Sequence, residues 1–202
     1  MRWLKNNLVI ALLGFLHGCS VTPHTNYYVL ASSTQATAAN TNPISLGIGP
    51  VLVADYLDRV QITLVKDSVL EVDEFNRWGE PLDAGITRVL MEELSAQLAS
   101  GKLVRFPWRG DEIPELRIKV MVLELNRQNN VALMKVAWSL SALGSGDELH
   151  RGIEIYKQSV ADDSHNSLVA AYNQILYQLA SHMSSTIKQS NPQPSTTAVA
   201  SD

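Results

Sequence analysis

The chain has 202 residues, of which 46% are hydrophobic and 18% charged, and its formal net charge is −4. This length suits one domain that buries most of its unfolded surface in a single core. The acidic balance argues against nucleic acid or an anionic membrane surface as an electrostatically recruited partner. The single cysteine, Cys19, excludes an intramolecular disulfide and any cysteine-rich metal site.

The first part of the chain has the pattern of a secretory signal. Arg2 and Lys5 precede an apolar run over 8–16, which is shorter than the about 20 residues that a transmembrane helix needs. We therefore predict a signal peptide over 1–18 that is removed before Cys19. Its removal leaves 14 basic and 20 acidic side chains, a formal charge of −6.

The sequence Leu-His-Gly-Cys at 16–19 resembles the lipobox of bacterial lipoproteins, with His17 as its one departure. The resemblance implies that Cys19 carries a diacylglycerol, so that two or three acyl chains anchor the protein. Each buried CH₂ adds about 0.8 kcal/mol to such an anchor. Ser20 stands where an aspartate would favour the inner membrane, so we expect the outer membrane, with the domain facing the periplasm. In the alternative interpretation, an ordinary signal peptide or a short anchor helix leaves Cys19 as a bystander thiol.

Composition divides the rest of the chain into a tether, a domain and a tail. We predict a lipidated tether over 19–42 that contains a short edge strand at 27–30, then an α+β domain over 43–189. The tail over 190–202 and the segment 31–42 are rich in Ser, Thr, Ala, Asn, Gln or Pro. Such segments cannot offset their ordering entropy by burial, so both are expected to be loose.

Hydrophobic patterning predicts the elements of the domain. Runs rich in aliphatic residues, several alternating with polar ones, predict strands at 45–54, 60–65, 68–75, 116–125, 132–142 and 149–160. Pro81 is expected to open a helix that stops at Gly101, with Glu92 and Glu93 off its apolar stripe. A second helix, capped within 162–164, runs to about Lys188.

This order predicts a single α+β domain: a largely antiparallel sheet with two main helices packed on one face. The last three strands are expected to form an antiparallel meander.

We find no convincing catalytic, cofactor or metal motif in the sequence. The acidic and imidazole groups at 162–165 fit helix capping better than a metal site, because acids at a helix start are stabilised by the macrodipole. The acids at 71–74 fit a solvated strand end better than a paired-carboxylate site. His24 and His182 have no sequence-adjacent partner. Enzymatic activity and a bound cofactor are therefore not expected.

The tryptophans are candidate contact residues. Phe106, Trp108 and Arg109 fall in an expected exposed loop, and Trp and Arg are enriched at binding hot spots. Trp78 precedes the first helix, where its indole either packs against the helix start or lines a contact surface. Trp138 alternates with apolar residues of a strand and is expected in the core.

Together these landmarks resemble the auxiliary lipoproteins of ABC-type intermembrane lipid transport, the PqiC/YmbA-like family of paraquat-inducible protein C. The matching pieces cover nearly the whole mature chain in order: Cys19, Tyr27-Tyr28-x-Leu30, Val53-x-Asp55-Tyr56-Leu57, Trp78-x-x-Pro81-Leu82, Leu94-Ser95-x-Gln97-Leu98, Trp138 within the strand 131–140, and the long C-terminal helix. The tail after Lys188 departs from the pattern.

The resemblance implies a non-enzymatic role on the outer membrane. Such lipoproteins work with an inner-membrane-anchored MCE-domain protein that forms a lipid conduit across the periplasm, and in this branch they assemble into a homo-oligomeric ring that receives the conduit. Two alternatives remain at the level of sequence. One is a lipid carrier or envelope-modifying enzyme with an apolar groove between sheet and helix and activity dependent on Asp163 or His165; the other is a structural envelope lipoprotein.

Overall fold

The computed structural model describes residues 24–34 and 44–190, so the predicted signal, Cys19 and residues 191–202 of the predicted tail lie outside the described residues. Eight strands and two α-helices are present in this part of the chain. The strands are β1 (Asn26–Tyr28), β2 (Leu46–Val53), β3 (Gln61–Lys66), β4 (Val69–Trp78), β5 (Leu103–Arg105), β6 (Leu116–Gln128), β7 (Val131–Ala142) and β8 (Glu148–Ser159). The helices are α2 (Leu82–Leu98), α3 (His165–Ser190) and a 3₁₀ turn, η1 (Gly110–Glu112).

The strands form two sheets. One has the order β1-β4-β3 and the other the order β5-β2-β6-β7-β8. Both sheets are mixed, because β1 pairs in parallel with β4, and β2 in parallel with β5 and β6. The predicted α+β class, the edge strand at β1 and the antiparallel β6-β7-β8 meander are confirmed. The longest pairings, β6 with β7 and β7 with β8, are antiparallel as expected. The division of the strands into two sheets and the strand β5 were not predicted.

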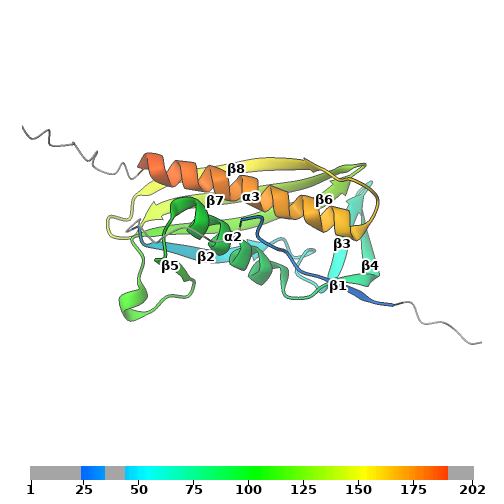
Figure 1. Ribbon diagram of the computed structural model, residues 1–202, viewed down its shortest axis with the longest axis horizontal. Helices are drawn as coiled ribbons and strands as arrows, with labels where there is room; N and C mark the ends of the chain where they lie inside the picture. Colours follow the sequence, from blue (N-terminus) through cyan, green and yellow to red (C-terminus); the bar gives the residue numbers. More distant parts are fainter. Residues whose placement is uncertain (1–23, 35–43, 191–202) are drawn as a thin grey trace, which may run out of the picture.

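Both helices pack on the same face of the five-stranded sheet, side by side (Figure 1). The packing follows from alternation: Leu46, Ile48, Ile118 and Val120 point to the helices and are at most 2% exposed. Their partners come from the apolar stripes of α2 and α3, for example Leu90 and Leu176, which are fully buried. These side chains fill the space between sheet and helices.

The helix ends show which termination signals act. α2 stops three residues before the predicted Gly101, because Ala99 adopts the left-handed conformation (φ 50°) and its N–H donates to Ala96 O at 3.3 Å. The predicted cap of α3 is confirmed: Ser164 Oγ accepts a hydrogen bond from the Ser167 N–H at 3.1 Å. Within the described residues, neither helix combines the length and apolarity required to span a bilayer.

Candidate interaction surface

The structure brings together the two polar groups that the sequence singled out. His165, at the start of α3, has its Nε2 3.4 Å from Oδ2 of Asp73 on β4. Asp73 also accepts hydrogen bonds from the Phe75 N–H, at 2.9 Å, and Asp163 pairs with Arg127. Asp73 thus joins β4 to the start of α3, and Asp163 joins the segment before α3 to β6. Nowhere in 24–34 and 44–190 do three His, Cys, Asp or Glu side chains group so as to hold a metal.

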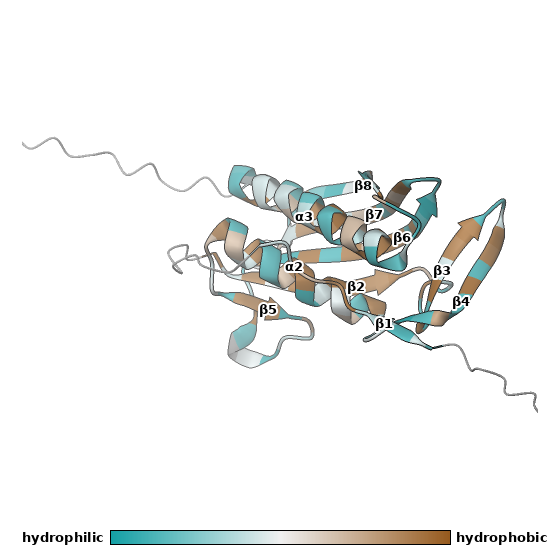
Figure 2. Ribbon diagram, turned by 45° about the vertical axis from the view of Figure 1, so that its right-hand side comes forward, coloured by the Kyte–Doolittle hydropathy of each residue, from teal (hydrophilic) through white to brown (hydrophobic). Residues whose placement is uncertain are grey.

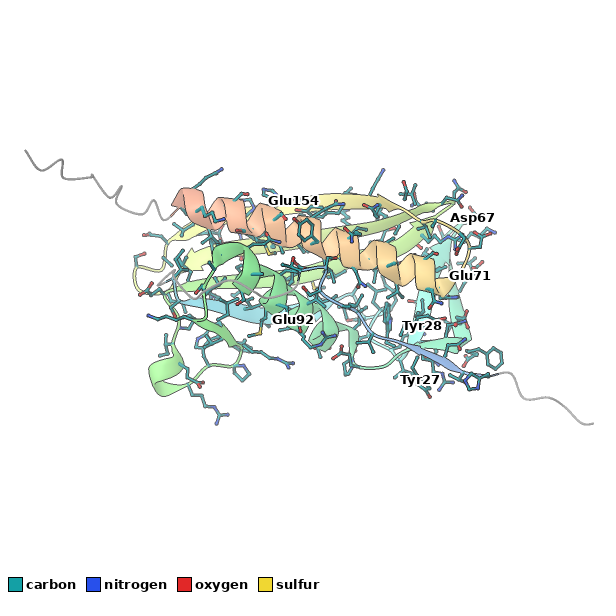
Figure 3. All side chains as sticks on the ribbon, viewed as in Figure 1. Tyr27, Tyr28, Asp67, Glu71, Glu92 and Glu154 are labelled. Atoms are coloured by element: carbon teal, nitrogen blue, oxygen red, sulfur yellow. The ribbon has the colours of Figure 1, made fainter. Side chains whose placement is uncertain are left out.

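A second polar cluster lies between β8 and α3, and Glu154 is its centre (Figure 3). Trp138 Nε1 donates to Oε1 of Glu154 at 3.0 Å, and His182 Nδ1 lies 2.8 Å from its Oε2. The Tyr156 hydroxyl donates to the same Oε2. Burial alone raises the pKa of Glu154, but the hydrogen bonds from Tyr156 and Trp138 and the nearby His182 together hold that pKa below its ordinary 4.5. Glu154 therefore ties two strands to α3 as a charged acceptor.

Residues 30–34 are held by a buried carboxylate, Glu93 of α2, which is 0% exposed. Its two oxygens accept hydrogen bonds from Ser32 Oγ (2.8 Å), Ser33 N (2.5 Å) and Thr34 Oγ1 (2.6 Å). Further bonds join the segment to the helices: Arg88 Nη2 to Leu30 O (2.6 Å), Ala31 N to Asn173 Oδ1 (3.0 Å) and Gln174 Nε2 to Ser33 Oγ (3.2 Å). The expectation of a loose segment is therefore wrong for residues 31–34, which are fixed to both helices.

The side of the five-stranded sheet away from the helices carries an apolar row. Leu52 pairs with Met121, Met121 with Ala137, and Ala137 with Ile153, so that the row crosses four strands. Paired residues share a face of the sheet, and these four alternate with the core residues of their strands. Leu52 and Ile153 are 53% and 64% exposed.

Cations flank this apolar row on both sides. Lys119 pairs with Ser139 and Ser139 with Arg151 on one side, while Lys135 pairs with the exposed Ile155 on the other. A groove of about 410 Å³ runs along the face. We refer to the following residues as the open face: Leu52, Lys119, Met121, Lys135, Ala137, Arg151, Ile153 and Ile155. A surface with an apolar centre and a charged rim has the layout of a protein contact.

The aromatic loop predicted as a contact follows β5, at the edge of the same sheet. Phe106 is 44% exposed and meets the half-buried Trp108 edge-on, with ring centroids 5.1 Å apart. The Trp108 ring lies over Gly47 of β2, where a Cβ would be 2.8 Å from Cζ3. Arg109 is exposed. The structure thus places these three predicted residues in one loop that folds onto the sheet.

Trp78, the fourth predicted contact residue, lies elsewhere. It is the last residue of β4, is 6% exposed and belongs to the core. Its backbone N–H donates to Val60 O. A side chain buried to this extent offers almost no surface to a partner, so its role in this structure is packing at the junction of β4 and α2.

Gly47→Ala is expected to lower the free energy of unfolding by about 1–3 kcal/mol, the usual cost of overpacking. The added Cβ would lie 2.5 Å from Pro114 Cγ as well as 2.8 Å from the Trp108 ring. Urea unfolding measures the change. Gly144→Ala is the control, because a Cβ there meets nothing within 4 Å. Equal stability of the two variants would show that the loop does not pack on Gly47 in solution.

Comparison with known proteins gives the family. The model of the ABC-type transport auxiliary lipoprotein component matches residues 28–184. The chain belongs to this family. The match includes most of α3, all residues of the open face and every strand, of which only β1 is matched in part. The protein is therefore an auxiliary lipoprotein component of ABC-type transport, as its sequence landmarks indicated.

Solved structures share the fold. An uncharacterized protein, 21% identical, aligns with a TM-score of 0.67 over 82% of this chain and 99% of its own. A Xanthomonas campestris protein of family DUF330, 11% identical, also aligns with a TM-score of 0.67, over 82% and 98% of the two chains. No curated protein matches the chain.

Proposed function

We propose that this protein is an outer-membrane lipoprotein that acts, without catalysis, as the docking component of an MCE-type intermembrane lipid transport system. Its family membership supports a transport role. The lipobox-like sequence before Cys19, followed by Ser20, supports an anchor in the outer membrane. The observation that carries the docking role is the loop that exposes Phe106 and Arg109 beside the half-buried Trp108.

The hydrogen bonds made by the buried and half-buried carboxylates support a non-enzymatic role. Asp73, Glu93 and Glu154 each accept several hydrogen bonds within the chain. These contacts hold segments together and leave the carboxylates engaged. The lipid-carrier alternative needs apolar space between sheet and helices, and core side chains such as Leu90 and Leu176 occupy that space.

The proposed partner is an MCE-domain protein that reaches from the inner membrane, and the lipoprotein is proposed to meet it as a ring of several copies. Partner contacts are assigned to the exposed aromatic loop, with Phe106, Trp108 and Arg109. Aromatic and Arg side chains in such a loop match the composition of interface hot spots.

The test is co-purification of the mature protein with the MCE-domain partner encoded in the same organism. We expect retention by the wild type and a loss of about tenfold or more in affinity for Phe106→Ala/Arg109→Ala, since hot-spot truncations cost more than 1 kcal/mol each. Arg59→Ala, exposed on the turn before β3, is the matched control. Absence of binding by the wild type, purified and on membranes, would count decisively against docking.

A further inference from the structure

The hairpin of β3 and β4 carries a surface that the transport role does not explain. The hairpin projects from the body, at the end opposite β5 (Figures 1 and 2). Its tip is a tight turn in which Asp67 and Ser68 have φ of 50° and 64°, between the paired residues Lys66 and Val69. The tip is therefore a stiff projection.

Acidic and apolar side chains are exposed together on this hairpin. Val69 is 63% exposed and Phe75 43%, and Asp67, Glu71 and Glu74 are exposed beside them. Asp67 and Glu71 lie at the far end of the hairpin (Figure 3). We refer to these five residues as the hairpin surface. Lys66 and Arg77 are the cations of the hairpin, and Arg77 Nη2 lies 3.7 Å from Glu74, which leaves an acidic excess.

The open face has the opposite charge on a chain that is acidic as a whole. Its cations are Lys119, Lys135 and Arg151. Two acids accompany them: Glu148 pairs with Arg151, and Glu124 stands opposite Lys135 across the strands. The remaining charge is positive, and Arg117 adds to it on the same face, since it pairs with Ser141 two residues along from Lys119. The apolar row runs through the middle.

We propose that the open face of one copy of this chain receives the hairpin surface of a second copy. The two surfaces are complementary in charge and each exposes apolar side chains, so that Val69 and Phe75 meet the row containing Met121 and Ile153. The inference rests on the proposed self-assembly and names its contact. The hairpin surface, which is acidic and belongs to the same chain, matches the charge of this cationic face.

The contact is head-to-tail, because the two surfaces are different parts of the molecule. A pair of copies then keeps one unused open face, on one copy, and one unused hairpin, on the other, and further copies add until the assembly closes into a ring. A two-fold dimer would instead require both contacts to form at once between the same two copies.

Charge reversal tests the contact in the full mature chain carrying Cys19→Ala, which keeps the protein free of lipid. One variant reverses the open face, Lys119→Glu/Arg151→Glu; the other reverses the hairpin surface, Asp67→Lys/Glu71→Lys. All four side chains are exposed. Sedimentation and light scattering give the mass of each sample, and far-UV circular dichroism checks the fold.

We expect an oligomeric parent, and two variants that each become monomeric because like charges now meet, with association weakened by roughly 100-fold or more. An equal mixture of the two variants regains the parental mass, since every contact in it again joins opposite charges. The control Lys102→Glu/Glu92→Lys, which changes exposed residues outside both surfaces, keeps that mass.

Three results would overturn the proposal, each in a different way. A protein that is monomeric both as the Cys19→Ala parent in solution and as the lipidated protein with Cys19 on vesicles rules out self-assembly itself. Unchanged masses in both variants show that the copies associate through other surfaces while self-assembly holds. An unchanged mass together with lost binding of Lys119→Glu/Arg151→Glu to phosphatidylglycerol vesicles assigns the open face to the membrane. Binding of the MCE-domain partner is measured separately, so its failure is distinguishable from all three.

Discussion

Glu93→Ala is expected to lower the free energy of unfolding by about 2–4 kcal/mol and to release residues 30–34 from the helices. Hydrogen bonds to a charged acceptor contribute about 1.5–3 kcal/mol each and are not additive. Glu93 accepts such bonds from Ser32, Ser33 and Thr34. Urea unfolding measures the stability, and amide hydrogen exchange at Ser33 and Thr34 measures the release.

Glu92→Ala is the matched control, on the next residue of the same helix. Glu92 is exposed and pairs with Arg88 at 3.3 Å, four residues apart on the helix surface. Such pairs contribute about 0.3–0.5 kcal/mol. If both variants lose the same stability, or if exchange at Ser33 stays slow in Glu93→Ala, the carboxylate does not hold the segment.

The contribution of Glu93 is expected to depend on pH. Burial alone raises the pKa of Glu93 and is the largest single influence, but the hydrogen bonds from Thr34, Ser32 and Ser33 together hold that pKa below its ordinary 4.5. A lowered pKa in the folded state stabilises the protein fully above the unfolded-state value, and this stabilisation is lost as the pH falls through the folded-state value. The stability difference between wild type and Glu93→Gln should therefore be constant near pH 7 and shrink as the pH falls below about 4.5. A difference that does not change with pH would contradict this.

Local patterns predicted the elements because each element depends on its own residues. The alternation from Leu116 onward and the two helical stripes, one with Leu90 and one with Leu176, locate strands and helices without knowledge of neighbouring elements. The division into two sheets depends on which strands meet. Asn126 on β6, for example, bonds both the N–H and the C=O of Val65 on β3, 61 residues away. No local pattern predicts that contact.

The residues of the candidate site also divide into those that local sequence predicts and those that depend on tertiary contacts. An exposed aromatic loop could be predicted from Phe106, Trp108 and Arg109, because turn-forming and basic neighbours mark it locally. Glu93 was placed off the apolar stripe of its helix, and its burial comes from Thr34, 59 residues away. The contact between Glu154 and His182 likewise joins residues 28 apart. Burial of a charge depends on its tertiary partners, which a single sequence does not contain.

The apolar row of the open face depends partly on local pattern and partly on contacts between strands. The alternation within the predicted strands 116–125 and 132–142 was visible in the sequence, whereas the face on which Ile153 and Ile155 lie was not. The row itself required the register, which bulges between Ile48 and Val51 and between Val122 and Glu124 alter. Turn residues near Asn129 would have predicted the β6–β7 register only approximately.

Cys19→Ala is expected to move nearly all of the protein from the membrane fraction to the soluble periplasmic fraction. Several acyl chains provide a stable anchor, whereas a single chain binds only marginally, so removal of the attachment cysteine removes the attachment. The fold should be unchanged, because the core of the described residues begins at Leu30. Fractionation and urea unfolding of the same variant measure the two effects.

Ser20→Asp is the companion variant, since it keeps the lipid and changes the residue that follows it. We expect this variant to stay membrane-bound but to move to the inner membrane, which density-gradient separation of the two membranes detects. A Cys19→Ala protein that remains in the membrane fraction would show that another part of the molecule provides the attachment. The open face, with its apolar row and its cations, is then the surface to test. If this face provides the attachment by contacting phospholipid, Lys119→Glu/Arg151→Glu should move the protein to the soluble fraction, which Cys19→Ala did not do.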